Sequence, residues 1–233
     1  MSLPKIFVAF DFSDKNQADS LLLALNPALC GVKVGLELFT TLGPNWVSYA
    51  IQQGFPVFLD LKYHDIPNTV AKSCLAAAQL GVQMMNVHAS GGLAMMQAAR
   101  EALQTLPSPP VLLGVTVLTS LSELELSTVG VTGGLPAQVE RLAALNQQAG
   151  LDGVVCSAHE AAHLRLLFGP SFKLITPGIR VTDTPIHDQK RIMTPEAAMA
   201  AGSDCLVIGR CITQAPNPAK KVEEILRRID LTK

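Results

Sequence analysis

The chain has 233 residues, of which 48% are hydrophobic and 16% are charged, and its formal net charge is −1. A nearly neutral chain without runs of like charge does not indicate nucleic acid as a partner, so we expect a small-molecule ligand. No apolar run is long enough to span a membrane, and the first residues lack the features of a signal peptide. We therefore expect a cytoplasmic protein with no membrane contact.

Eight short apolar runs are predicted to be buried β-strands. A continuous apolar run is typical of a strand that is covered on both faces, as in a parallel sheet. In chain order the runs span residues 6–10, 31–35, 56–62, 84–88, 111–118, 153–156, 173–176 and 205–208.

Helical segments separate these strands. They are expected over residues 14–25, 36–54 with a break at Gly43–Pro44, 69–80, 91–106, part of 120–134, 136–149, 158–168, 195–201 and 218–228. Eight strands alternating with helices predict an α/β fold with a single (β/α)8 TIM barrel domain over residues 1–233. An open doubly wound sheet is the alternative, but no glycine-rich fingerprint follows the first strand.

The stretch from residue 58 to residue 69 carries charges within an otherwise apolar chain. Asp60 and Lys62 are two residues apart, so a regular strand places their side chains on the same face. Asp65 follows just past the end of the strand. Burying such charges is costly unless they are paired or used in chemistry.

Polar residues also follow other strands, at the barrel face where active sites lie. Near these strand ends are Asp11, Lys33, Asp60, Lys62, Asn86 or His88, Thr119, Arg180 and Arg210. A structural ion pair between Asp60 and Lys62 is the alternative interpretation. It does not account for the further charges of Asp11, Lys33 and Asp65, so we expect a catalytic site.

The loops after the seventh and eighth strands indicate a phosphate site. They supply Arg180, Gln189, Gly209 and Arg210, and barrels often bind phosphate at these loops. A guanidinium group matches phosphate oxygens. The segment 178–190 is long enough to close over a ligand. An exposed loop with ordinary surface arginines is the alternative.

Two other patterns carry little weight as sites. His159, Glu160 and His163 match the His-Glu-x-x-His pattern of zinc proteases. They fall on the outer helix after the sixth strand with no third ligand evident, so we expect surface histidines and no metal site. Five scattered cysteines, none in a Cys-x-x-Cys pair, indicate free thiols in a reducing compartment.

Four segments resemble the orotidine 5′-phosphate decarboxylase family, in the same order along the chain. They are 60–69, with the pattern Asp-x-Lys-x-x-Asp-Ile-Pro-x-Thr, 115–120, 176–180 and 207–210. The resemblance implies the last step of UMP synthesis, in which orotidine 5′-monophosphate loses carbon dioxide to give UMP. It also implies a homodimer that needs neither a metal nor an organic cofactor.

The resemblance implies catalytic roles for four residues. Lys62 protonates C6 of the pyrimidine, and Asp60 lies against the leaving carboxylate. Lys33 and Asp65 complete an alternating charge network, in which Asp65 comes from the partner subunit.

The resemblance also implies substrate contacts. These residues are Asp11, Lys33, Asp60, Ile66, Thr69, Thr119, Arg180, Gln189, Gly209 and Arg210. Asp11 and Lys33 contact the ribose, the last four hold the phosphate, and Thr119, or its neighbour Ser120, faces the base. Ile66 and Thr69 reach the partner subunit's site together with Asp65.

Two other functions compete with this interpretation. One is a related barrel that decarboxylates or aldolises a sugar phosphate through a metal-stabilised enediolate. The resemblance implies that such enzymes carry an acid on the second strand as a metal ligand. This chain has Lys33 at that position, which would repel Mg²⁺. A non-catalytic nucleotide-phosphate binding protein would keep Arg210. It would have no use for the set formed by Lys33, Asp60, Lys62 and Asp65.

Overall fold

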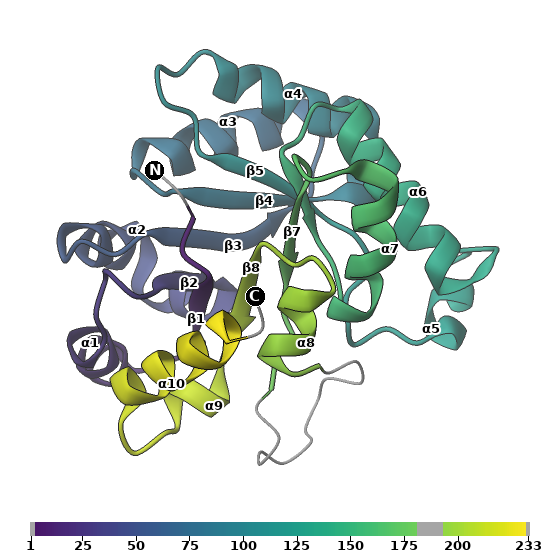
Figure 1. The fold of residues 1–233 in the computed structure, drawn as a ribbon. Coiled ribbons are helices and arrows are strands. Elements are labelled where there is room, and N and C mark those ends of the chain that lie inside the picture. Colours follow the sequence, from purple (N-terminus) through teal and green to yellow (C-terminus); the bar gives the residue numbers. More distant parts are fainter. Residues whose placement is uncertain (1–2, 181–192, 232–233) are drawn as a thin grey trace.

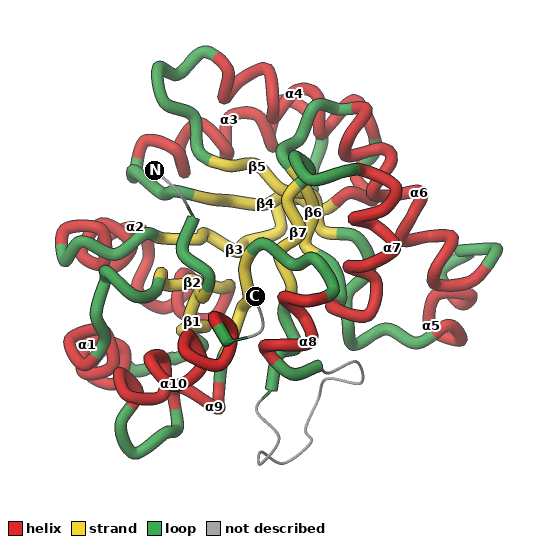
Figure 2. The backbone as a smooth tube through the Cα atoms, viewed as in Figure 1, coloured by secondary structure: helices red, strands yellow, loops and turns green. Residues whose placement is uncertain are grey.

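The structure is a computed structural model that describes residues 3–180 and 193–231. Eight parallel strands close into a barrel in chain order, each paired with its neighbours along the sequence (Figures 1 and 2). They are β1 (Ile6–Phe10), β2 (Gly31–Gly35), β3 (Val57–Tyr63), β4 (Met84–His88), β5 (Val111–Val115), β6 (Gly153–Val155), β7 (Lys173–Thr176) and β8 (Cys205–Ile208). The predicted (β/α)8 barrel is confirmed.

Helices form an outer layer around the strands (Figure 1). They are α1 (Lys15–Ala24), α2 (Leu36–Gln52), α3 (Pro67–Gln79), α4 (Leu93–Gln104), α5 (Glu123–Thr128), α6 (Gly134–Gln148), α7 (Ala158–Phe168), α8 (Pro195–Ala200), α9 (Arg210–Thr213) and α10 (Pro218–Asp230), with a 3₁₀ turn η1 (Ala89–Gly91). The last helix, α10, contacts both α8 and α1, so the helical layer closes on itself.

Most element boundaries agree with the sequence prediction, and the differences have local causes. α3 begins at Pro67, two residues early, because proline fits the first turn of a helix. β5 ends at Val115, three residues before the predicted end. Gly43 interrupts α2 with φ +66° and ψ −166°, a conformation that glycine alone adopts readily, so the predicted break is confirmed. The short α9 and η1 were not predicted.

The apolar core has two layers separated by the strands. On β1, Phe7 and Ala9 belong to the cluster inside the barrel, while Val8 and Phe10 belong to the cluster between strands and helices. Side chains on a barrel strand alternate in this way between the inside and the outside. Both faces of each strand are therefore buried, which is why the strands read as continuous apolar runs.

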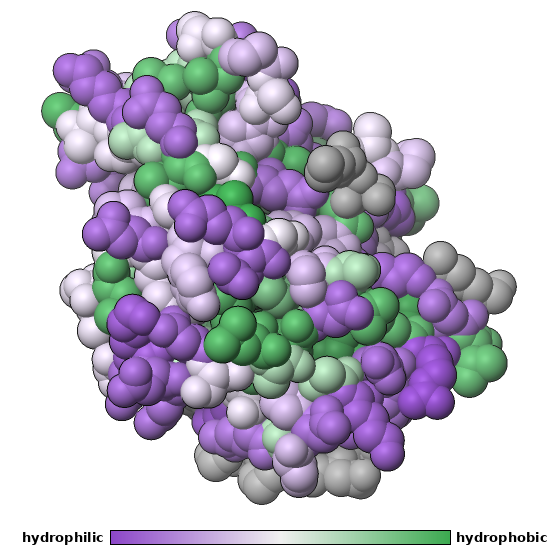
Figure 3. Space-filling model, turned by 90° about the vertical axis from the view of Figure 1, so that its left-hand side faces the viewer, coloured by the Kyte–Doolittle hydropathy of each residue, from purple (hydrophilic) through white to green (hydrophobic). Residues whose placement is uncertain are grey.

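The outer surface is mixed in polarity. Figure 3 shows the side of the molecule on which α1 and α2 lie, with apolar residues gathered across its middle and hydrophilic residues around them. Within residues 3–180 and 193–231, none of the helices is both long enough and apolar enough to cross a membrane.

Candidate active site

A cavity of about 730 Å³ opens at the C-terminal ends of the strands. Apolar residues of the barrel interior, among them Ala9, Phe58 and Val155, form its floor. The strand ends and the loops that follow them supply polar walls. The predicted site residues that line the cavity are Asp11, Lys33, Asp60, Lys62, Thr119, Arg180, Gly209 and Arg210.

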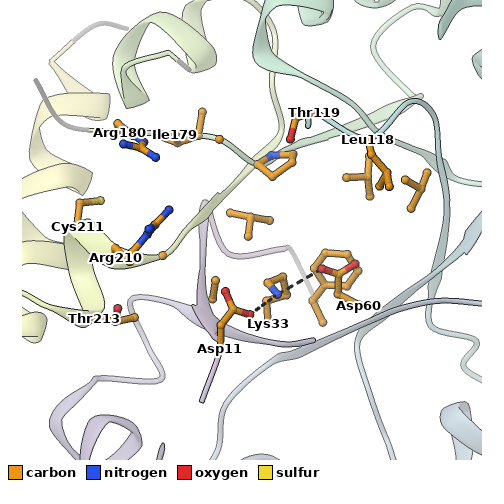
Figure 4. A pocket seen from close by; sticks show the side chains of 18 of the residues that line it. Asp11, Lys33, Asp60, Leu118, Thr119, Ile179, Arg180, Arg210, Cys211 and Thr213 are labelled. Carbon is orange, nitrogen blue, oxygen red and sulfur yellow. Dashed lines mark hydrogen bonds and ion pairs between the residues drawn. The ribbon is translucent and has the colours of Figure 1, made fainter. Parts of the chain in front are cut away.

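Four charged side chains of alternating sign form a continuous array in this cavity. Lys33 Nζ lies 3.2 Å from Asp11 Oδ1 and 3.3 Å from Asp60 Oδ2. Lys62 Nζ lies 2.7 Å from the other carboxylate oxygen of Asp60, Oδ1. Figure 4 shows Lys33 between Asp11 and Asp60. The array therefore joins the ends of three neighbouring strands, β1, β2 and β3.

The two central members of the array are charged although they are buried. Burial alone lowers the pKa of Lys33, but the attraction of Asp60 and Asp11 outweighs it and the pKa is raised. Burial alone raises the pKa of Asp60, but Lys33 and Lys62 outweigh it and the pKa is lowered. The two side chains are only 10% and 11% exposed. Water therefore screens them little, and their charges create a fixed field in the cavity.

The backbone of β3 is irregular where this array is built. Lys62 has φ +51°, and among the described residues it is the only non-glycine residue with a positive φ. The pairing of β3 with β4 also shifts register between Leu59 and Tyr63. The spacing of Asp60 and Lys62 predicts that they lie on one face of a regular strand. Their side chains do meet, but through a distorted backbone of the kind often found at functional sites.

Asn86 on β4 supports the irregular segment. Its side chain is fully buried. Asn86 Nδ2 donates to Asp60 Oδ1 at 2.7 Å, and Asn86 Oδ1 accepts from the backbone N–H of Lys62 at 2.8 Å. The sequence predicts Asn86 or His88 near a strand end but gives neither residue a role. A polar amide within an apolar strand is the sequence feature that could have indicated the role of Asn86.

Positive side chains gather at the other end of the cavity. Arg180 follows β7, and Arg210 begins α9 directly after β8. Figure 4 shows both guanidinium groups on the side of the cavity away from Asp60. Gly209 lies beside them, and a Cβ built there would meet only Ala9 Cβ, at 3.6 Å. The predicted Gln189 falls within 181–192, outside the described residues.

Three predicted residues lie apart from the cavity of their own chain. Asp65, Ile66 and Thr69 are exposed at the start of α3 and do not line it. Asp65 Oδ1 accepts from the backbone N–H of Ile66 at 2.7 Å. In the described part of the chain, Asp65 has no ion pair with Lys33 or Lys62.

The histidine pattern on α7 has a surface environment. His159 and His163 are both exposed, and His163 Nε2 lies 3.1 Å from Glu140 Oε2. Within the described ranges, no cluster of three or more His, Cys, Asp or Glu residues could hold a metal ion. Sequence reasoning also missed several residues that line the cavity. They are Phe12, Gln17, Cys211, Thr213 and Gln214, together with apolar side chains.

Comparisons with known proteins identify the family. The family model described as "Orotidine 5′-phosphate decarboxylase / HUMPS family" matches residues 4–225. The chain belongs to this family. An orotidine 5′-phosphate decarboxylase of Idiomarina loihiensis is 56% identical over 98% of this chain and 99% of that protein. One of Legionella pneumophila is 54% identical over 96% of this chain and 98% of that protein.

Solved structures agree with this assignment. The crystal structure of orotidine 5′-phosphate decarboxylase from Lactobacillus acidophilus has a TM-score of 0.88 and 38% sequence identity. The match covers 98% of this chain and 100% of that one. The resemblance to the orotidine 5′-phosphate decarboxylase family is confirmed. The roles of the individual residues remain predictions.

Proposed function

We propose that this protein is a carboxy-lyase that converts orotidine 5′-monophosphate to UMP and carbon dioxide in pyrimidine biosynthesis. The observation that carries the proposal is the array of Asp11, Lys33, Asp60 and Lys62, whose central pair Lys33 and Asp60 is buried, at one end of a cavity with two arginines at the other. Relatives at 56% and 54% identity bear the name of this activity.

The array suits the difficult step of this reaction. Loss of carbon dioxide from C6 of the pyrimidine leaves a carbanion with no adjacent carbonyl to delocalise it. The barrier reduction required is large, on the order of 20 kcal/mol. An ammonium group held beside C6 stabilises the carbanion electrostatically and then protonates it. Lys62 is our candidate for this group. Its ammonium lies 2.7 Å from Asp60, and the substrate carboxylate would also lie against Asp60.

Asp60 has two effects in this proposal. Its carboxylate holds the ammonium groups of Lys33 and Lys62 in place. Because its pKa is lowered, it stays ionised and repels a substrate carboxylate that lies against it. Release of carbon dioxide removes that repulsion, so the interaction favours the transition state over the bound substrate.

The arginine end of the cavity is the candidate phosphate site. Arg180 and Arg210 offer planar donor groups that match phosphate oxygens. The open space next to Gly209 would let a phosphate approach the backbone. Binding energy gained here can hold the pyrimidine against the charge array at the opposite end.

The exposed residues at the start of α3 support a homodimer with shared sites. Ile66 is 67% exposed, and Asp65 and Thr69 beside it are exposed and lie outside the cavity of their own chain. A second subunit that covered this surface would give all three residues a partner. In the proposed dimer, Asp65 completes the charge array of the partner's site, and Ile66 and Thr69 contact the partner's substrate.

A metal-dependent reaction on a sugar phosphate is the competing function. It would need carboxylates free to hold a divalent cation. Here Lys33 occupies the space between Asp11 and Asp60, with Nζ 3.2 Å and 3.3 Å from their oxygens.

The deciding experiment is a decarboxylation assay on orotidine 5′-monophosphate, followed by ultraviolet absorbance, with and without EDTA. We expect turnover at the same rate in both. No turnover, or turnover only with added Mg²⁺, would refute the proposed function.

A further inference from the structure

Asn86 is a buried amide whose two ends both bind candidate catalytic residues. It is 0% exposed, and its neighbours on β4 are Met85 and Val87. An amide in such surroundings costs free energy unless its polar atoms are hydrogen-bonded. Here the donor faces the Asp60 carboxylate and the acceptor faces the Lys62 N–H. These partners also fix the orientation of the amide, since a carboxylate needs a donor and an N–H needs an acceptor.

The amide takes the place of a missing backbone contact between β3 and β4. Leu59 pairs with Met85, and the next pair is Tyr63 with Val87. Three residues of β3 therefore lie opposite Asn86 alone. The Lys62 N–H, which falls in this irregular segment, bonds to the Asn86 side chain at 2.8 Å. The residue that donates this bond, Lys62, is the same residue whose backbone has φ +51°.

The same amide orients the Asp60 carboxylate. Oδ1 of Asp60 accepts from both Asn86 Nδ2 and Lys62 Nζ, at 2.7 Å each. The other oxygen, Oδ2, faces Lys33 at 3.3 Å. With Asn86 in place, one oxygen of Asp60 is directed to each lysine. Asn86 thus fixes both the carboxylate and the backbone that carries the Lys62 side chain.

We propose that Asn86 is a positioning residue for the decarboxylation, which holds the Asp60 carboxylate and the Lys62 backbone in the geometry the reaction needs. It does not line the cavity, so it acts through these two residues. The inference rests on the proposed function. Leucine at this position could make neither bond. An ionised aspartate could not donate to Asp60 and would repel it.

The test compares Asn86→Ala with Asn146→Ala. Asn146 on α6 is also 0% exposed, but its Nδ2 donates to Leu142 O, and it does not line the cavity. A misplacement of about 1 Å at a reacting group costs about 100-fold in rate. We expect Asn86→Ala to lose about that factor in kcat, with KM and the Kd for UMP within about threefold. Asn146→Ala should keep kcat within about twofold of wild type.

Asn86→Asp gives a second readout that a purely structural role would not produce. It keeps the size of the side chain but places two carboxyl groups side by side. When one proton is shared between them, the new carboxyl can donate to Asp60 and still accept from Lys62, as the amide does. We therefore expect the kcat of Asn86→Asp, relative to wild type at the same pH, to rise as the pH falls.

Each outcome bears on one proposal. If kcat of Asn86→Ala stays within about threefold of wild type, or falls no further than that of Asn146→Ala, the positioning role is wrong. If Asn86→Ala does not fold, the pH profile of Asn86→Asp decides, and a constant ratio to wild type overturns the role. Wild-type protein with no turnover of orotidine 5′-monophosphate refutes the proposed function instead.

Discussion

Asp60 holds the charge array together, because its two oxygens serve two lysines and one amide. The lysines in turn keep the carboxylate ionised in a site that water barely reaches. Neither sign of charge could be buried here without the other. The charges of the array therefore depend on one another, and substitutions in it should affect stability as well as activity.

Substitution of Lys62 tests its proposed role as the proton donor. If its ammonium stabilises and protonates the carbanion, Lys62→Ala should lower kcat by about 10⁴-fold, the joint effect of losing a general acid and an electrostatic group. UMP has no carboxylate at C6, so its binding should remain within about tenfold of wild type. Steady-state kinetics and UMP calorimetry measure both. Lys72→Ala, at an exposed position on α3, is the control. Turnover near the wild-type rate would rule out the acid role.

The second prediction concerns the pH dependence of stability. The pKa of Asp60 is lower in the folded chain than its ordinary value of 3.8. Its contribution to stability is therefore complete above that ordinary value and is lost as the pH falls through the folded-state pKa. Asp60→Asn removes this contribution, so its unfolding free energy should fall less than that of wild type on strong acidification.

At neutral pH the same variant should be less stable than wild type. Lys33 stays buried after Asp60→Asn but keeps only Asp11 as a counter-charge. Breaking a buried ion pair costs about 3 kcal/mol. Urea unfolding of both proteins at neutral and acid pH gives the two comparisons. Equal slopes of stability against pH would contradict the lowered pKa of Asp60.

Residue types and spacing predicted Asp11, Lys33, Asp60 and Lys62 in the cavity, but they also grouped Asp65 with these charges, and Asp65 does not line the cavity of its own chain. Lys33 and Asp60 interrupt apolar strands, and a buried charge indicates a partner or a function. The role of Asn86 was not predictable, because it depends on which residue faces which across two strands. The shift in pairing between Leu59 and Tyr63 leaves no trace in residue type.

Apolar runs predicted the strands well because both faces of each strand are buried. The short α9 and η1 escaped because three or four residues carry no periodic pattern. The left-handed backbone at Lys62 was also not predictable, since lysine has no preference for positive φ. It coincides with the register shift between β3 and β4 and with the hydrogen bond from the Lys62 N–H to Asn86.

This backbone predicts an unusual order of stability for two variants at position 62. Alanine is normally more stable than glycine by about 1 kcal/mol. At φ +51° the order should reverse, because a left-handed conformation costs a non-glycine residue about 1–2 kcal/mol. We therefore expect Lys62→Gly to unfold at higher urea concentration than Lys62→Ala. Both variants lack the same charge, so electrostatics cancels in the comparison.

The control pair is Lys72→Gly and Lys72→Ala within α3. There the usual order should hold, with alanine more stable. If Lys62→Ala is at least as stable as Lys62→Gly, the contacts of Asn86 do not impose the positive φ, and the backbone relaxes once the side chain is removed.

Closure of the barrel brings together residues that are far apart in the sequence. Asp11 and Arg210 lie almost 200 residues apart in the chain and line one cavity. The alternation of strands and helices predicted this meeting, since the C-terminal strand ends of a barrel share one face. The same alternation did not predict where Asp65 lies. Asp65 is exposed, so its position within one chain does not explain a catalytic role.

The dimer proposal supplies that reason and makes a quantitative prediction. Lys62→Ala and Asp65→Ala should each be inactive alone. After equal mixing and subunit exchange, half of the dimers are mixed. Each mixed dimer has one site with both defects and one site with none, so about a quarter of the wild-type activity should return.

The matched control mixes Lys62→Ala with Lys33→Ala. Both residues line the cavity of their own chain, so every site keeps a defect and activity should stay absent. One protein of each mixture is labelled with ¹⁵N, because the two lysine variants have the same mass, and mass spectrometry of the intact dimers then confirms that exchange has occurred. No recovery in the first mixture despite exchange would place Asp65 in the site of its own subunit, and recovery in both mixtures would show that the cavity residues are themselves shared.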